Sequence, residues 1–293
     1  MNRRKNRFTI ILSLSFFITI LCHSCMTFRM SPKKIAAYFQ DKNIPVEQTS
    51  YNSSSREIHY AQTGDNEKPL ILFVHGSPGS LSAFIHFLAD TTLLKEHLLI
   101  TIDRPGFGYS NFGIGEPSIN RQAEILMPIV EKYSVNKPVL LVGHSLAAPV
   151  IAQMAINHPD LIDGLIMVAG SIDPDLEPNE AWFRIPLSTP FLNWLLPRSL
   201  RASNEELYNF KSELTNMLPL WKKITVPVVV IQGKKDVLVD PRNADFAKRM
   251  IISAPVEIIY RDDMNHFVPW SNPELINEGI LLVEKLIRTE KNN

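Results

Sequence analysis

The sequence predicts an α/β fold with a mostly parallel, doubly wound sheet and a small, mostly helical lid. Short β-branched or apolar runs alternate with segments of helical spacing, which is typical of right-handed βαβ crossovers. The chain has 293 residues, 45% of them apolar, which is enough for one large domain with a substantial core. The 30 basic and 30 acidic residues give a formal net charge of zero, which argues against a nucleic-acid-binding protein.

The first 25 residues have the three-part layout of a secretory signal peptide. A basic start (Arg3, Arg4, Lys5, Arg7) precedes the apolar run Phe8–Leu21 and the small-residue region Cys22-His23-Ser24-Cys25. The apolar run is shorter than the roughly 20 residues that span a bilayer. Cys25 resembles the lipidation site of bacterial lipoproteins, and an uncleaved signal anchor reaching towards Phe28 is the alternative. Both alternatives predict an exported protein that is attached to a membrane through its N-terminus.

Cys22 and Cys25 are the only cysteines of the chain, so the folded body has no disulfide. Their C-x-x-C spacing occurs in redox and zinc motifs, but no βαβ unit precedes it and no second ligand pair follows.

The predicted elements follow in order after a polar lead-in, residues 26–52, which we expect to pack on the surface. Residues 53–293 form the predicted catalytic domain. Arg56–Gln62 alternates like an edge strand. Six further runs are predicted strands, mostly buried on both faces of a parallel sheet: Leu70–Val74, Leu98–Ile102, Val139–Val142, Leu165–Val168, Val228–Ile231 and Val256–Ile259. Helical spacing is present in Leu81–Asp90, Ile119–Tyr133, Leu146–Asn157, Asn243–Ile251 and Pro273–Arg288.

One interval, at about 172–224, lacks a buried strand and is rich in proline, tryptophan and leucine. Helical pieces are predicted near Phe191–Leu196 and Asn204–Met217. An insertion here would lie over the carboxyl ends of the strands, where open α/β sheets bind ligands, so it predicts a lid. Its apolar side chains are candidates to line a substrate pocket, although packing of the lid onto the body is the simpler interpretation for each one: Trp182, Phe183, Phe191, Trp194, Leu195 and Trp221.

The sequence Gly143-His144-Ser145-Leu146-Ala147 joins a predicted strand to a predicted helix. A serine on such a sharp turn is held in a strained conformation with its hydroxyl above the sheet, as in the G-x-S-x-G motif of serine hydrolases. Ala147 stands where glycine is usual. Ser145 is therefore the candidate nucleophile, and a helix N-cap is its alternative role.

A serine nucleophile needs a histidine base and a carboxylate that orients it, in the chain order Ser, acid, His for this architecture. Asp236 follows the end of one predicted strand, and His266 follows the next strand. These two residues are the candidates, with Asp240 as the alternative acid.

The tetrahedral intermediate also needs backbone N–H donors. Leu146, the residue after the nucleophile, supplies one candidate donor, and Ser77 in the loop His75-Gly76-Ser77-Pro78 supplies the other. Asp103-Arg104 follows another strand end, and we expect these two residues to pair within the scaffold.

Taken together, five motifs in order resemble the α/β-hydrolase superfamily, in the group with a lid after the sixth strand: HGSPGS, DRPGFGYS, GHSLA, the GxxD at Gly233–Asp236 and the NHF at Asn265–Phe267. The resemblance covers roughly Tyr51 to Arg288. It implies a triad of Ser145, Asp236 and His266, oxyanion donors at Ser77 and Leu146, and no metal or organic cofactor. Members that open epoxides or remove halogens carry aspartate as nucleophile, and aminopeptidases of the group have HGGPG, so this chain departs from both.

The expected function is hydrolysis of a carboxylic ester, thioester or lactone with an apolar acyl group, through an acyl-serine intermediate. Hydrolysis of a carbon–carbon bond by the same triad is one alternative, and a non-catalytic ligand-binding protein is the other. We expect a small-molecule substrate, and no nucleic-acid partner.

Overall fold

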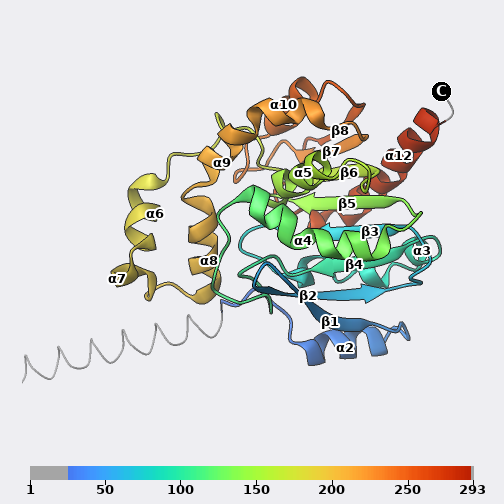
Figure 1. Cartoon of the computed structure of the whole chain (residues 1–293), viewed down its shortest axis with the longest axis horizontal. Coiled ribbons are helices and arrows are strands. Elements are labelled where there is room, and N and C mark those ends of the chain that lie inside the picture. Colours follow the sequence, from blue (N-terminus) through green and yellow to red (C-terminus); the bar gives the residue numbers. More distant parts are fainter. Residues whose placement is uncertain (1–25, 292–293) are drawn as a thin grey trace, which may run out of the picture.

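The computed structural model describes residues 26–291, so the predicted signal peptide and the candidate lipidation site Cys25 lie outside the described residues. Its centre is an eight-stranded sheet in the order β1-β2-β4-β3-β5-β6-β7-β8 (Figure 1). The strands are β1 (Glu47–Ser53), β2 (Arg56–Thr63), β3 (Leu70–Val74), β4 (Leu98–Ile102), β5 (Val139–His144), β6 (Gly164–Val168), β7 (Val228–Gly233) and β8 (Val256–Arg261). β1 and β2 are antiparallel to their neighbours and the other strands are parallel, which confirms the predicted fold class.

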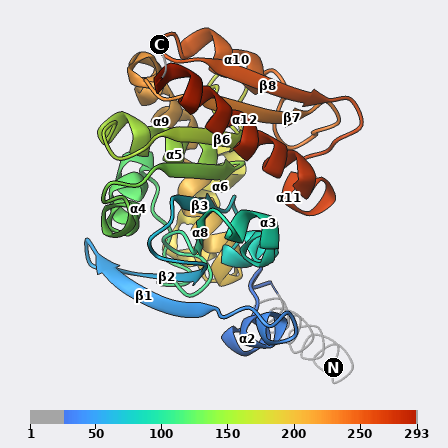
Figure 2. The same ribbon diagram turned by 90° about the vertical axis from the view of Figure 1, so that its right-hand side faces the viewer.

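Helices cover both faces of this sheet. Figure 2 shows α4 (Ile119–Tyr133) and α5 (Ala147–Asn157) on one face, and α3 (Thr91–Leu94) and α12 (Pro273–Lys291) on the other. The remaining elements of the body are α2 (Pro32–Gln40), the 3-10 segments η1 (Leu81–Phe84) and η2 (Phe87–Ala89), α10 (Asn243–Met250) and α11 (Val268–Ser271). The predicted single helix Leu81–Asp90 is thus two short 3-10 turns.

The side chains of a central strand divide between the two layers. In β3, Leu70, Leu72 and Val74 pack in the core beneath α4 and α5, whereas Ile71 and Phe73 pack in the core beneath α12. Successive side chains of a strand point to opposite faces, so a strand covered on both faces must be apolar throughout. This is why the central strands could be identified from their composition.

The lead-in differs from our expectation of a surface segment. Helix α2 buries Ile35 and Phe39, and β1 pairs with β2 along its whole length, from Glu47↔Gln62 to Ser53↔Arg56. The sheet therefore begins at Glu47, before the predicted start of the domain at residue 53. β1 is an edge strand without a fully buried residue, so its polar sequence carried no strand signal.

Between β6 and β7 the chain forms an insertion, defined here as residues 172–224. It contains α6 (Ala181–Ser188), α7 (Pro190–Asn193), α8 (Arg198–Leu207), α9 (Phe210–Met217) and η3 (Leu218–Lys223). In Figure 1, α6, α7 and α8 stand off the end of the sheet at which the parallel strands finish. The predicted helix Asn204–Met217 is two helices, and α8 begins earlier than predicted because the extended Pro197 precedes its first turn.

Candidate active site

Ser145 lies on the sharp turn between β5 and α5. Its φ is +56°, in the left-handed region that is rare for a residue with a side chain, and its N–H donates to the Val168 carbonyl at 2.8 Å. A Cβ on Gly143 would lie 2.9 Å from the Ala147 carbonyl oxygen, so the first small residue of the motif is needed for the turn to close. The N-cap of α5 is Leu146, and no side chain caps this helix. The alternative role of Ser145 as an N-cap is therefore wrong.

Asp236 and His266 come together beyond the ends of β7 and β8. Asp236 Oδ2 lies 2.8 Å from His266 Nδ1, and both residues are buried. The other oxygen, Oδ1, accepts hydrogen bonds from the N–H groups of Leu238 and Val239, at 2.9 Å each. Burial by itself raises the pKa of Asp236, but the hydrogen bond and charge of His266 and the two N–H donors outweigh it, and the pKa lies below its ordinary value.

Asp240, the alternative acid, has a different partner. Its carboxylate forms an ion pair with Arg242 at 2.6 Å. The structure thus joins His266 to Asp236 and to no other carboxylate within residues 26–291.

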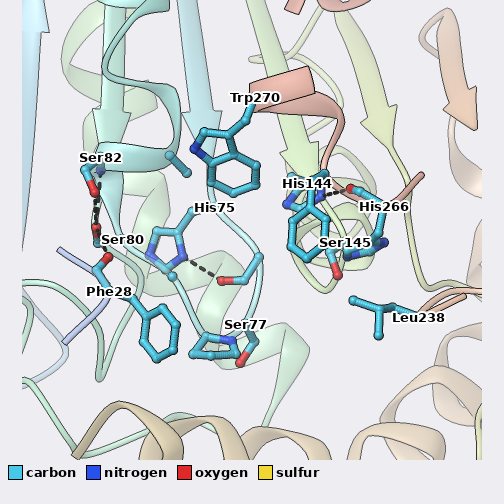
Figure 3. A pocket seen from close by; sticks show the side chains of 15 residues that line it. Phe28, His75, Ser77, Ser80, Ser82, His144, Ser145, Leu238, His266 and Trp270 are labelled. Atoms are coloured by element: carbon cyan, nitrogen blue, oxygen red, sulfur yellow. Dashed lines mark hydrogen bonds between the residues drawn. The ribbon is translucent and has the colours of Figure 1, made fainter. Parts of the chain in front are cut away.

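The His266 side chain lies beside that of Ser145 in Figure 3, and both residues line the same two cavities. Because Nδ1 is bonded to Asp236, Nε2 is the imidazole nitrogen available to the serine hydroxyl.

His144 is a site residue to which the sequence analysis assigned no role. It is buried, and its Nε2 donates to the backbone carbonyl of His266 at 2.9 Å. Burial and the nearby His266 lower the pKa of His144 to about 3, so it is neutral. It therefore connects the loop that carries His266 to the turn that carries Ser145. Its position next to Ser145 in the sequence was the signal that could have identified it.

The loop after β3 lies against Ser145. A Cβ on Gly76 would lie 2.9 Å from Cβ of Ser145, so only glycine permits this approach. Neither the Ser77 N–H nor the Leu146 N–H donates a backbone hydrogen bond to another residue in the described part of the chain. Both donors are therefore available at the turn.

Arg104 anchors this loop by hydrogen bonds. Its guanidinium donates to the carbonyls of His75 and Gly76, at 2.7 and 3.1 Å, and forms a buried ion pair with Glu206 of α8 at 2.6 Å. The expected pairing of Asp103 with Arg104 is wrong, because Asp103 instead contacts His59 at 2.9 Å. Burial raises the pKa of Glu206 above its ordinary value although the Arg104 charge opposes this shift.

A cavity of about 540 Å³ opens in front of Ser145. Its apolar lining comes from Phe28, Leu238, Phe267 and Trp270, and its polar lining from the Gly76–Ser77 loop and His266 (Figure 3). A second cavity of about 210 Å³ lies on the insertion side, and its lining includes Glu177, Glu180 and Arg184 together with Ser145.

The apolar side chains of the insertion do not line the larger cavity, contrary to one of our expectations. Trp182, Phe191, Trp194 and Leu195 are exposed, and Phe183 packs edge-on against Trp182 at 5.1 Å. Trp221 is buried and packs against Phe246. The lining residues Phe28 and Trp270 are distant in the sequence and had no local signal.

Across residues 26–291, no three histidine, cysteine or acidic side chains are grouped so that they could hold a metal ion. No helix within the same residues is long and apolar enough to cross a bilayer.

Comparison with known proteins shows where the chain is similar to others. A family model of the alpha/beta hydrolase fold matches residues 69–193, which include the Gly76–Ser77 loop and the Ser145 turn. Epoxide hydrolase 1 of Caenorhabditis elegans is 28% identical over 111 residues, 37% of this chain and 27% of the relative. The pimeloyl-[acyl-carrier protein] methyl ester esterase of Citrobacter koseri is 37% identical over 126 residues, 43% of this chain and 45% of the relative. Each alignment thus spans less than half of the relative.

Solved structures share the fold over more of the chain. A thermophilic esterase from Thermogutta terrifontis superimposes with a TM-score of 0.66 at 17% identity, over 82% of this chain and 99% of its own.

Proposed function

Because the chain belongs to the α/β-hydrolase superfamily, we propose that it is a serine hydrolase that cleaves a carboxylic ester, thioester or lactone. Ser145 is the proposed nucleophile, His266 the general base and Asp236 the residue that orients the base.

The observation that best supports this assignment is the pairing of His266 with Asp236 at 2.8 Å, beside a serine on a strained turn. Three side chains from three separate strand ends meet here, and all three residue types are those that an activated serine requires. A binding protein has no need of this combination.

The geometry suggests the following sequence of steps. His266 Nε2 removes the hydroxyl proton of Ser145 as Oγ attacks the substrate carbonyl carbon and forms a tetrahedral intermediate. The intermediate collapses when the bond to the leaving oxygen or sulfur breaks, and the imidazolium returns the proton to the leaving group. Water then attacks the acyl-Ser145 ester by the same route and releases the carboxylic acid. Asp236 stabilises the imidazolium throughout.

The proposed oxyanion donors are the backbone N–H groups of Ser77 and Leu146. Each such donor contributes about 3–4 kcal/mol to stabilisation of the transition state. Arg104 positions the Ser77 donor, since it binds the Gly76 carbonyl, which belongs to the same peptide unit as the Ser77 N–H, and also the His75 carbonyl of the unit before it.

The apolar cavity supports an apolar acyl group as the part of the substrate that it receives. Phe28, Phe267 and Trp270 supply aromatic surface within a volume of about 540 Å³. The insertion, which we propose acts as a lid, contributes Glu180 and Arg184 to the smaller cavity beside Ser145.

The proposed nucleophile, Ser145, favours ester cleavage over epoxide opening. The Citrobacter koseri relative is named as a methyl ester esterase. The Caenorhabditis elegans relative is named as an epoxide hydrolase, but family members that open epoxides carry aspartate where this chain has Ser145.

Labelling with a fluorophosphonate tests the nucleophile, since only an activated serine reacts. We expect wild-type protein to be labelled and Ser145→Ala to lose both labelling and turnover of p-nitrophenyl esters, by on the order of 10⁶-fold. Ser82→Ala is the matched control, because Ser82 lines the same cavity but bonds Ser80. Labelling that persists in a folded Ser145→Ala protein would refute the assignment. A series of p-nitrophenyl esters of rising chain length would measure the acyl preference.

We also propose that the protein is exported and held at a membrane by acylation of Cys25. Mass spectrometry of the N-terminus tests this. A lipid-modified Cys25 at the start of the mature chain is the expected result, and Cys25→Ser should abolish the modification. An intact, unmodified Met1 on membrane-bound protein would favour the uncleaved signal anchor instead.

A further inference from the structure

The outer side of the insertion carries a concentration of exposed apolar side chains. Trp182 is 78% exposed and Ile185 54% on α6, and Phe191 is 82% exposed and Trp194 57% at α7. Within each pair the residues are three positions apart, so they share one face of a helical turn. We call these four residues the outer aromatic face. Soluble proteins seldom gather large apolar side chains in this way without a partner.

The outer aromatic face is almost free of charge. Residues 181–197 contain a single charged side chain, Arg184. That guanidinium already bonds Glu180 and so has its counter-charge within the protein. If this face moved into an apolar medium, no unpaired charge would therefore lose its water.

The beginning of the described chain lies at the same place. The hydroxyl of Ser199, in the first turn of α8, donates to the carbonyl of Met26, and Arg29 lies over the rings of Tyr109 and Phe112. Trp194 is five residues before Ser199, so the two lie at most about 18 Å apart. The N-terminal chain is thus fastened to the body next to the outer aromatic face.

The sequence that precedes Met26 supplies the second argument. The apolar run Phe8–Leu21 ends five residues before Met26, again no more than about 18 Å of chain. A bilayer that holds this run is consequently brought close to the insertion. Tryptophan is also the side chain most typical of membrane–water interfaces, because its ring is apolar and its N–H is polar.

We propose that the outer aromatic face inserts into the interfacial layer of a phospholipid bilayer. The protein then contacts the membrane by two elements, the segment before Met26 and the helices α6 and α7, which lie at the far end of the insertion in Figure 1. Phe28 lines the cavity in front of Ser145, so the cavity lies near the point at which the chain reaches the membrane. This contact does not depend on the catalytic assignment, because none of its residues belongs to the proposed triad.

Tryptophan fluorescence of the full-length protein in phosphatidylcholine–phosphatidylglycerol vesicles tests the proposal. Lipids brominated in the upper part of the acyl chain should quench the emission, and most of this quenching should disappear in Trp182→Phe/Trp194→Phe. Trp270→Phe, which removes a tryptophan of the cavity, should retain it. Quenching by aqueous iodide should show the opposite pattern: vesicles should protect the emission of Trp182 and Trp194 from iodide.

The first variants remove the fluorophores themselves, so a second pair of variants tests whether the aromatic side chains cause the docking. Trp182→Ser/Phe191→Ser should shift the docking equilibrium, read from bromine quenching of Trp194, by about tenfold for each aromatic withdrawn. Val135→Ser/Ile252→Ser is the matched control, because both residues are exposed but precede strands at the opposite end of the sheet. Full quenching by iodide in vesicles would overturn the proposal. Protection of Trp182 and Trp194 from iodide that is equally strong without vesicles would overturn the proposal in favour of the N-terminal segment as the occupant. Protection that rises with protein concentration would overturn it in favour of a second copy.

Discussion

Removal of the Glu206 carboxylate tests the buried ion pair that joins the insertion to the Gly76–Ser77 loop through Arg104. In Glu206→Ala, the Arg104 guanidinium keeps its bonds to the carbonyls of His75 and Gly76 and to Gln122. It loses its only carboxylate among the described residues, in a site where the Arg104 side chain has no exposed surface.

The burial of Arg104 sets the expected loss of unfolding free energy. Removing one partner of a buried ion pair leaves an uncompensated charge and costs about 3–5 kcal/mol of unfolding free energy. For a chain of this size, the change corresponds to a fall in melting temperature on the order of 10 °C. Glu206→Gln retains a hydrogen-bond acceptor and should cost less.

Urea denaturation, followed by the fluorescence of the buried Trp221, measures the change. Glu205→Ala is the matched control on the same helix, because Glu205 accepts only a backbone N–H, that of Gly115 at 2.6 Å. Its loss should cost about 1–2 kcal/mol. An unfolding free energy of Glu206→Ala within about 1 kcal/mol of the wild type would refute the reasoning, since water would then have to reach Arg104.

Three further predictions concern the proposed catalytic residues. Asp236→Asn should reduce turnover of an ester about 10⁴-fold by favouring the wrong tautomer of His266, whereas Asp240→Asn should have little effect; the reverse ranking would contradict the assignment. Ser77→Ala should retain most esterase activity, because the proposed donor is the backbone N–H, and a loss as large as that of Ser145→Ala would show that the hydroxyl acts directly. Burial raises the pKa of Asp236, but the hydrogen bonds and charge of its partners hold the pKa below its ordinary value. As the pH falls, this carboxylate is therefore protonated in the unfolded chain before it is protonated in the folded protein. The stability contributed by the carboxylate is therefore present above about pH 4 and lost below it, and acid unfolding of Asp236→Asn should lack this component; an equally steep loss in the variant would contradict the sign.

Local sequence was sufficient for the parts of the site that follow strand ends. Ser145, Asp236 and His266 each follow the end of a run that the sequence identifies as a strand, by three, five and seven residues. Parallel strands finish at one edge of a sheet, so the predicted fold class places all three residues at the same edge. The proposed nucleophile and base could thus be selected without coordinates, and the acid could be narrowed to Asp236 or Asp240.

Other features depended on contacts between distant residues, which leave no periodic signal. The partner of Arg104 is 102 positions away, and β1 is identified only by its pairing with β2. An apolar segment of sequence indicates that its side chains avoid water in the folded protein, but it does not indicate which surface covers them. For that reason the insertion aromatics were expected in a pocket or against the body, and the structure has most of them exposed.

The sequence by itself therefore determined seven of the eight strands, the turn at Ser145 and the strand ends beside it, because these depend on the order and period of neighbouring residues. The tertiary structure alone decided that Asp236 rather than Asp240 reaches His266, that Glu206 neutralises Arg104, and that Phe28 and Trp270 line the cavity. These choices depend on distances between separate elements, which are set only when the layers pack together.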